Sequence, residues 1–214
     1  MDDAILGNLR TAYDAKASER DAVETAPWKA AERVRFLTEL NRQDRTRLLE
    51  IGSGPGRDGL FFQNEGLSVV CTDLSPNMVS LCRRKGLEAR VMDCLHLDFP
   101  ECSFDAVFAL NSLLHVPKAS LRAGLDQINR LLRPGGLVYV GVYGGEDFEG
   151  ALPSDDHEPN RFFSFYTDIG LLTVLSSVFE LVYFRRVDPG WSSSTHFQSL
   201  IVRKKAESPA TDDA

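Results

Sequence analysis

Short apolar runs rich in β-branched residues alternate with longer amphipathic segments through the central part of the chain. This alternation is typical of βαβ units, in which strands are buried and the connections between them are helical. We therefore predict an α/β fold with a doubly wound, mostly parallel sheet. Its strands are predicted at 47–51, 67–72, 88–92, 104–110 and 136–143.

The clearest connecting helix is predicted from Lys118 to Leu132. Pro117 stands at its entry, where the missing N–H of proline costs nothing. Leucine and isoleucine side chains recur at helical spacing and share one face of this segment. The sequence Arg-Pro-Gly-Gly at 133–136 then ends the helix.

The regular alternation ends at residue 144. A polar, acidic segment at 144–160 is predicted to be a long loop, and loops of this length are usually functional or mobile. A helix at 168–178, capped by Thr167 or Asp168, and strands at 179–187 and 196–204 follow.

The most informative segment reads L-L-E-I-G-S-G-P-G-R-D from Leu48 to Asp58. An apolar run opens into three glycines spaced two apart, which lets the backbone turn tightly and approach a ligand. A helix starting near Arg57 would present its free N–H groups to the same crevice. Asp73 ends the next apolar run, where a carboxylate can accept hydrogen bonds from both hydroxyls of a ribose. Together these features indicate a nucleoside cofactor.

The spacing of the glycines departs from the dinucleotide pattern G-x-G-x-x-G, whose third glycine would fall at Arg57. The segment instead resembles the first motif of the class I S-adenosylmethionine-dependent methyltransferases, E-x-G-x-G-x-G. Four later segments match further landmarks of that family in order, so that the resemblance covers roughly residues 45–204. They read V-C-T-D-L-S-P-N-M at 70–78, V-M-D-C at 91–94, F-D-A-V-F at 104–108 and L-L-R-P-G-G-L at 131–137.

This resemblance implies a Rossmann-like sheet of seven strands whose last two form an antiparallel hairpin at one edge. It also implies S-adenosyl-L-methionine as the cofactor. The residues that match cofactor-binding positions of the family are Tyr13, Glu50, Gly52, Ser53, Gly54, Gly56, Asp73, Leu74, Met78, Asp93, Cys94, Leu95 and Asn111.

Each of these residues also has a purely structural interpretation. The glycines would suit any turn between a strand and a helix, Asp73 could cap a helix, and Asp93 could be a turn residue. Asn111 could simply end its strand, and Tyr13 could anchor the N-terminal helix to the domain rather than close over a ligand.

Two histidines are candidates for a catalytic base. His115 follows the fourth strand, at the edge of the sheet where ligands bind in open α/β folds, and its ordinary pKa suits proton transfer near neutrality. His196 begins the last strand. His115 could instead pack the start of the next helix or frame the cofactor, because a histidine here is common in the family whatever the substrate.

The acceptor is expected beside loops at the same edge of the sheet. These loops are rich in rings, which suggests an aromatic or apolar acceptor. Some of the rings could instead pack the late helix against the sheet. The residues predicted to bind the acceptor are His115, Tyr143, Phe163, Tyr166 and Trp191.

The charge and cysteine content of the chain limit which partners and which cellular compartment are expected. The formal net charge of −7 opposes binding to phosphate backbones and anionic membranes, so nucleic acid and membrane partners are not expected. No apolar stretch is long enough to span a bilayer, and no signal peptide opens the sequence. The four cysteines lack C-x-x-C spacing, which indicates free thiols in a reducing cytoplasm and no metal site.

We therefore predict one methyltransferase domain at 1–205, with an N-terminal helical lid at 1–42, a core at 45–205 and a disordered tail at 206–214. The lid is expected to contain helices at 4–17 and 27–41. The predicted activity is methyl transfer to an oxygen or nitrogen atom of a small metabolite, by a monomer or homodimer. A cofactor-binding regulatory or scaffold subunit, a peptide or protein methyltransferase, and a nicotinamide oxidoreductase are the alternatives.

Overall fold

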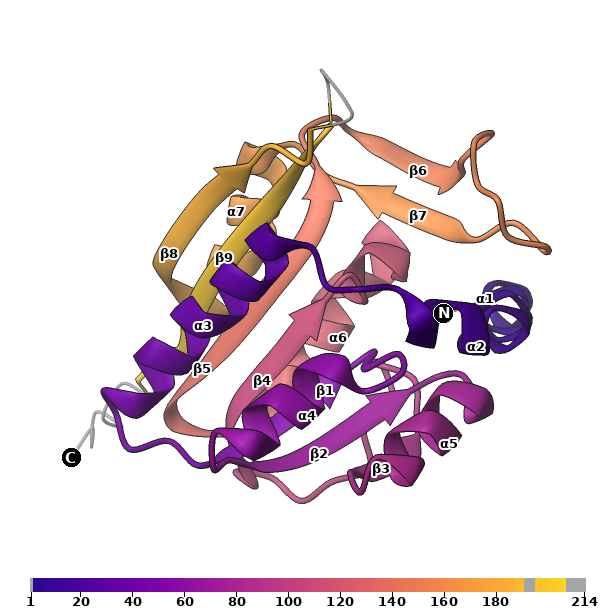
Figure 1. Cartoon of the computed structure of the whole chain (residues 1–214). Coiled ribbons are helices and arrows are strands. Elements are labelled where there is room, and N and C mark those ends of the chain that lie inside the picture. The colour runs from indigo at the N-terminus through magenta and orange to yellow at the C-terminus, as the bar shows by residue number, and fades with distance from the viewer. Residues whose placement is uncertain (1, 191–194, 207–214) are drawn as a thin grey trace.

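The structure is a computed structural model that describes residues 2–190 and 195–206. Its centre is a seven-stranded sheet in the order β3-β2-β1-β4-β5-β9-β8 (Figure 1). The first five strands along the chain run parallel, β9 is antiparallel to β5, and β8 is antiparallel to β9. The predicted mostly parallel sheet with an antiparallel edge hairpin is confirmed.

Most strands of this sheet lie close to the predicted ranges, because they contain short apolar runs. The exception is β5, which begins at Leu132 rather than at residue 136 and so includes the Arg-Pro-Gly-Gly segment. Four of the predicted ranges, 47–51, 104–110, 179–187 and 196–204, are those of β1, β4, β8 and β9 in the structure. The strands are β1 (Arg47–Ile51), β2 (Ser68–Asp73), β3 (Glu88–Val91), β4 (Phe104–Leu110), β5 (Leu132–Gly144), β8 (Phe179–Val187) and β9 (His196–Lys204).

Helices cover both faces of the sheet. On one face, apolar side chains of α3, α4 and α5 pack against the strands, and Phe36 and Phe62 are fully buried there. On the other face, α6 and α7 cover the strands with leucine and isoleucine side chains (Figure 1). The helices are α1 (Asp3–Ala15), α2 (Ala17–Ala22), α3 (Pro27–Asn41), α4 (Arg57–Asn64), α5 (Pro76–Arg84), α6 (Lys118–Leu131) and α7 (Asp168–Ser176).

Two predictions about connections need correction. The segment 144–160 is not one loop, because β6 (Phe148–Ala151) pairs with β7 (Phe162–Phe165) in a separate antiparallel ribbon. The N-terminal region contains a further short helix, α2, between the two that were predicted. The ribbon projects past the end of the main sheet toward α1 and α2 (Figure 1).

Candidate cofactor and active site

The glycine-rich turn between β1 and α4 has the left-handed backbone that its sequence requires. Gly52 and Gly54 have φ angles of 69° and 52°, a region that residues with a Cβ atom adopt at a cost. A Cβ on Gly52 would overlap the side chain of Ser112, which follows β4. A Cβ on Gly54 would meet no atom within 4 Å, so this part of the turn faces open space.

Asp73, at the end of β2, ties the same turn to the sheet. One carboxylate oxygen accepts the N–H of Gly54 at 2.8 Å and the other accepts the N–H of Ser75 at 2.8 Å. Burial raises the pKa of Asp73, although both hydrogen bonds act to lower it. Because each carboxylate oxygen has two lone pairs, the side chain keeps acceptor capacity toward a ligand.

A cavity of about 400 Å³ lies above the carboxyl ends of β1, β2 and β4. Helices α1 and α2 and the first turn of α3 form its opposite wall. The predicted site residues that line it are Tyr13, Glu50, Gly52, Ser53, Gly54, Asp73, Leu74, Asp93, Cys94, Asn111 and His115.

The chemistry of this cavity fits a nucleoside-containing cofactor. Asn111 has a φ of 55°, and its side-chain oxygen is buried without a hydrogen-bond partner, as is the hydroxyl of Ser112. Buried polar atoms are rarely left unpaired, so unpaired atoms in a cavity wall mark positions where a ligand can bind. With the open space beside Gly54 and the carboxylate of Asp73, they supply the acceptors and the close backbone approach that such a cofactor needs.

Tyr13 and His115 meet at the edge of the cavity. The Tyr13 hydroxyl lies 2.5 Å from Nε2 of His115, and Nδ1 of His115 lies 2.7 Å from the backbone oxygen of Phe162. A carbonyl only accepts, so Nδ1 carries the proton and Tyr13 donates to the Nε2 lone pair. Arg161 completes the chain by donating to the Tyr13 oxygen at 3.2 Å.

This arrangement favours the neutral forms of both rings. Burial, with the nearby charges of Arg161 and Arg20, lowers the pKa of His115 to about 3. Burial raises the pKa of Tyr13, and the same two arginines act in the opposite direction. His115 is therefore a neutral imidazole, and its Nε2 lone pair already accepts a hydrogen bond from Tyr13.

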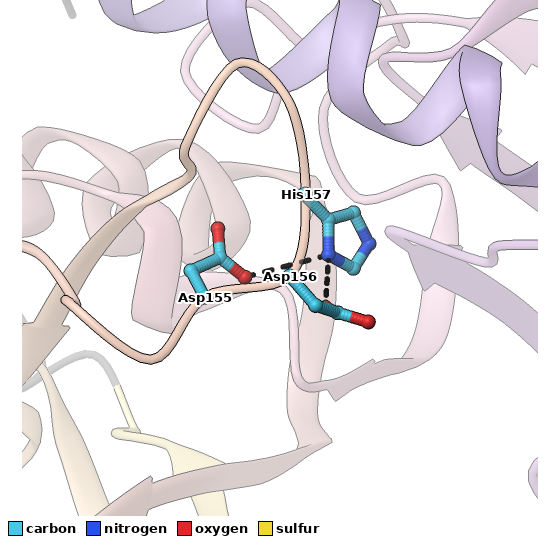
Figure 2. Close-up of side chains that lie close together, drawn as sticks. All are labelled: Asp155, Asp156 and His157. Atoms are coloured by element: carbon cyan, nitrogen blue, oxygen red, sulfur yellow. Dashed lines mark hydrogen bonds and ion pairs between the residues drawn. The ribbon is translucent and has the colours of Figure 1, made fainter.

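Arg161 is held in place by a group of side chains at the turn between β6 and β7. Asp155 binds its guanidinium at 2.6 Å, and Asp156 binds Lys16 of the N-terminal region at 2.8 Å. Figure 2 shows Asp155, Asp156 and His157 close together, with Nδ1 of His157 directed at both carboxylates. Their ligand atoms lie within 4.8 Å of one another, but both carboxylates are already paired with cations. We interpret this group as an ion-pair network that joins α1 to the ribbon.

Several predicted residues do not reach the cavity. Among the predicted cofactor contacts, Gly56 packs against Cys82, Met78 is buried beneath Tyr13, and Leu95 packs into the core. The predicted acceptor contacts Tyr143, Phe163 and Tyr166 are also absent from its lining, and Trp191 lies outside the described residues.

His196 also lies away from the cavity. Its Nε2 pairs with Asp168 at 2.8 Å, and the same carboxylate binds Gln198 and Arg186. His196 therefore belongs to an ion-pair group that joins α7 to the edge hairpin, and the geometry gives no support to its predicted role as a base.

Other cavity residues were not predicted from the sequence. They include Arg20, Lys29 and Arg57, whose long side chains look like solvated surface in the sequence, and Ser112, which follows Asn111. An amphipathic pattern in residues 3–22, with Leu6 and Leu9 on one face, was the available signal that α1 and α2 cover something apolar.

Comparison with known proteins supports the family. Residues 48–136 match a family model described as a methyltransferase domain. The mouse tRNA (carboxymethyluridine(34)-5-O)-methyltransferase ALKBH8 is 31% identical over 136 residues, which are 62% of this chain and 20% of the mouse protein. The chain thus spans about a fifth of the length of that relative.

Solved structures share the fold over most of the chain. The Burkholderia thailandensis 1,6-didemethyltoxoflavin-N1-methyltransferase, with bound 1,6-didemethyltoxoflavin and S-adenosylhomocysteine, has a TM-score of 0.71 and 24% identity. The match covers 92% of this chain and 87% of that one. A DhpI–SAH complex has a TM-score of 0.74 and 24% identity, and covers 95% and 98%. At these identities the likeness establishes the fold.

Within residues 2–190 and 195–206, no helix combines the length and the apolar character that crossing a bilayer requires.

Proposed function

We propose that this chain, which belongs to the class I S-adenosylmethionine-dependent methyltransferases, transfers a methyl group to an oxygen or nitrogen atom of a small acceptor. The observation that carries the proposal is the covered cavity. Leu6, Leu9 and Tyr13 of α1 face the glycine-rich turn across it. A wall of helices on this side leaves room for a small molecule and restricts access by a large one.

In this proposal the ends of β1, β2 and β4 would hold the cofactor. Gly52 and Gly54 would let the backbone approach its methionine part, and Asp73 would accept hydrogen bonds from the ribose hydroxyls. Asp93 and Cys94 would hold the adenine, and Asn111 would supply an acceptor for the amino group. S-adenosylmethionine, when bound, supplies a methyl group on a sulfonium, which is already a good electrophile.

The chain's own contribution to the reaction is alignment and exclusion of water. Helices α1 and α2 close the cavity, and holding the acceptor atom in line with the methyl group supplies much of the rate acceleration. Tyr13 and His115 frame the acceptor side. The Nε2 lone pair of His115 already accepts a hydrogen bond from Tyr13, so it is not available to take a proton from the acceptor. The proposal therefore favours an acceptor atom that is already deprotonated when it enters the site.

An acceptor carried on nucleic acid is the second candidate, because a relative at 31% identity is named for a modified tRNA nucleotide. The net charge of −7 is the observation against it. A chain that binds the cofactor without transferring methyl remains the alternative outside the enzyme class.

Calorimetric titration with S-adenosylmethionine, S-adenosylhomocysteine and NAD tests the cofactor. We expect micromolar binding of the first two and none of NAD; tight NAD binding alone would overturn the proposal. Incubation with labelled S-adenosylmethionine and separate pools of small metabolites and total tRNA then tests the acceptor. Label in the metabolite pool supports the proposal, label in tRNA supports the second candidate, and label in neither supports the non-catalytic alternative.

A further inference from the structure

Three cations line the cavity and form no ion pair with a carboxylate among the residues that the structure describes: Arg20 of α2, Lys29 of α3 and Arg57 of α4. Asp58 attracts Lys29 and Arg57 only from a greater distance. Nε of Arg20 and one terminal nitrogen of Arg57 are buried and have no hydrogen-bond partner. The ammonium of Lys29 lies over the rings of Trp28 and Tyr143, at 5.3 and 5.8 Å from their centroids. Buried cationic donors without acceptors are costly, so the unpaired nitrogens of the two arginines favour an anionic ligand in this cavity.

The carboxylates of the cavity do not neutralise these three cations at contact distance, because most of them bind other groups. Asp58 pairs with Arg33 at 2.8 Å, and Asp73 accepts backbone N–H groups. Asp93 binds the backbone of Leu95 and the ring of His96. Glu50 is buried and its pKa is raised, and Glu24 is exposed.

The cofactor assumed in the proposed function accounts for only part of this positive charge. It brings a single carboxylate, and its ammonium and sulfonium groups are both cationic. Arg57 directly follows the glycine-rich turn, so it is the cation placed to meet the methionine carboxylate. Arg20 and Lys29 remain, and the bound cofactor adds positive charge beside them.

Arg20 lies on the acceptor side of the cavity. Its guanidinium is 5.2 Å from the centroid of the Tyr13 ring, whose hydroxyl contacts His115. Burial lowers the pKa of Lys29, and the positive charge of Arg20 acts in the same direction. The two cations are therefore close enough to repel each other, and an anion between them would relieve that repulsion.

We propose that Arg20 and Lys29 bind an anionic group of the methyl acceptor, of the carboxylate or phosphate type. This inference rests on the proposed function and names its substrate class: a small acid with an apolar part that packs against Leu6, Leu9 and Val23. Of the rings predicted to hold an aromatic acceptor, Tyr143, Phe163 and Tyr166 lie outside the cavity lining, so in this proposal the anionic group carries the recognition.

The test uses the full chain saturated with S-adenosylhomocysteine and three probes of similar size. Phenylacetate and phenyl phosphate are the two anionic arms, and phenylacetamide is the neutral match. Dissociation constants are measured by NMR titration for the unaltered protein, Arg20→Gln and Lys29→Gln. Arg10→Gln is the matched control, because Arg10 is exposed on α1 and does not line the cavity.

We expect at least one acid to bind roughly tenfold more tightly than the amide, since charge-assisted hydrogen bonds are about twice as strong as neutral ones. That preference should disappear in Arg20→Gln and Lys29→Gln and persist in Arg10→Gln. A preference for phenylacetate would identify a carboxylate as the anionic group, and a preference for phenyl phosphate would identify a phosphate.

Equal binding of acids and amide, or a preference that both cavity variants retain, would overturn the inference. The titrations are repeated without S-adenosylhomocysteine, and acid binding that appears only in its absence would also overturn the inference, because the cations would then serve the cofactor alone. The two proposals can be refuted separately. Failure to bind S-adenosylhomocysteine would refute the proposed function, whereas binding of S-adenosylhomocysteine without a preference for acids would refute only this inference. Thermal melts of each variant confirm that it is folded.

Discussion

Lowering the pH should destabilise the protein through His115 more than through an exposed histidine. The imidazole is buried, both of its nitrogens are hydrogen-bonded, and its pKa is lowered to about 3. In the unfolded chain the same group has its ordinary pKa of 6.5. Protons therefore bind the unfolded state preferentially, and stability is lost as the pH falls through the unfolded value toward the folded one.

The size of the effect follows from those two values. At about pH 5 the unfolded histidine is almost fully protonated while the folded one stays neutral, so linkage gives a loss on the order of 2 kcal/mol relative to about pH 8. The loss approaches its full value only near the folded pKa. Other groups titrate over the same range, so the contribution of His115 must be isolated by comparison.

Urea unfolding at the two pH values, with the unaltered protein and His115→Asn, isolates it. The asparagine amide can still donate to the Phe162 carbonyl but does not titrate, so the variant should lose about 2 kcal/mol less between the two pH values. His96→Asn is the control, because the His96 side chain is 76% exposed. An equal pH dependence in the unaltered protein and His115→Asn would refute the reasoning.

Four further predictions concern single residues. Asp73→Asn should weaken the binding of S-adenosylhomocysteine and of adenosine by a similar factor, roughly 10- to 100-fold by calorimetry, if the carboxylate binds the ribose that both contain. A loss of affinity confined to S-adenosylhomocysteine would mean that Asp73 acts only by holding the turn. Gly54→Ala should cost roughly 1–2 kcal/mol in urea unfolding because of its positive φ, and should also reduce cofactor affinity, which unchanged affinity would contradict. Arg161→Gln should raise the pKa of Tyr13 in an NMR titration of labelled tyrosine, since the guanidinium acts to lower it; an unchanged pKa would remove that link. His196→Ala should leave cofactor binding unchanged in the same calorimetric assay, and a large loss would restore its predicted place in the site.

The positions of most strands along the chain and the place of the glycine-rich turn could be predicted because both depend on local sequence. The central strands contain runs of apolar residues, and Gly52 and Asp73 stand at the ends of two of them. The β6–β7 ribbon was missed because β6 contains Gly150 and no alternating pattern of apolar residues. The contact between Tyr13 and Arg161 joins residues 148 positions apart, and no local pattern encodes it. The same holds for the cations of the cavity, whose exposure depends on how α1 and α2 fold back over the sheet.

The geometry of Tyr13 and His115 also bears on which acceptors the site suits. A base must present a lone pair to the acceptor proton, but Nε2 of His115 faces the Tyr13 hydroxyl and Nδ1 faces a carbonyl. A proton could reach His115 only through the Tyr13 oxygen, and the resulting imidazolium would lie in a buried site that Arg161 and Arg20 already make positive. An acceptor whose methylated atom is itself a carboxylate or phosphate oxygen needs no such transfer, and the proposed anion site places Arg20 against that charge. The features that weaken His115 as a base are thus the ones that favour an acidic acceptor.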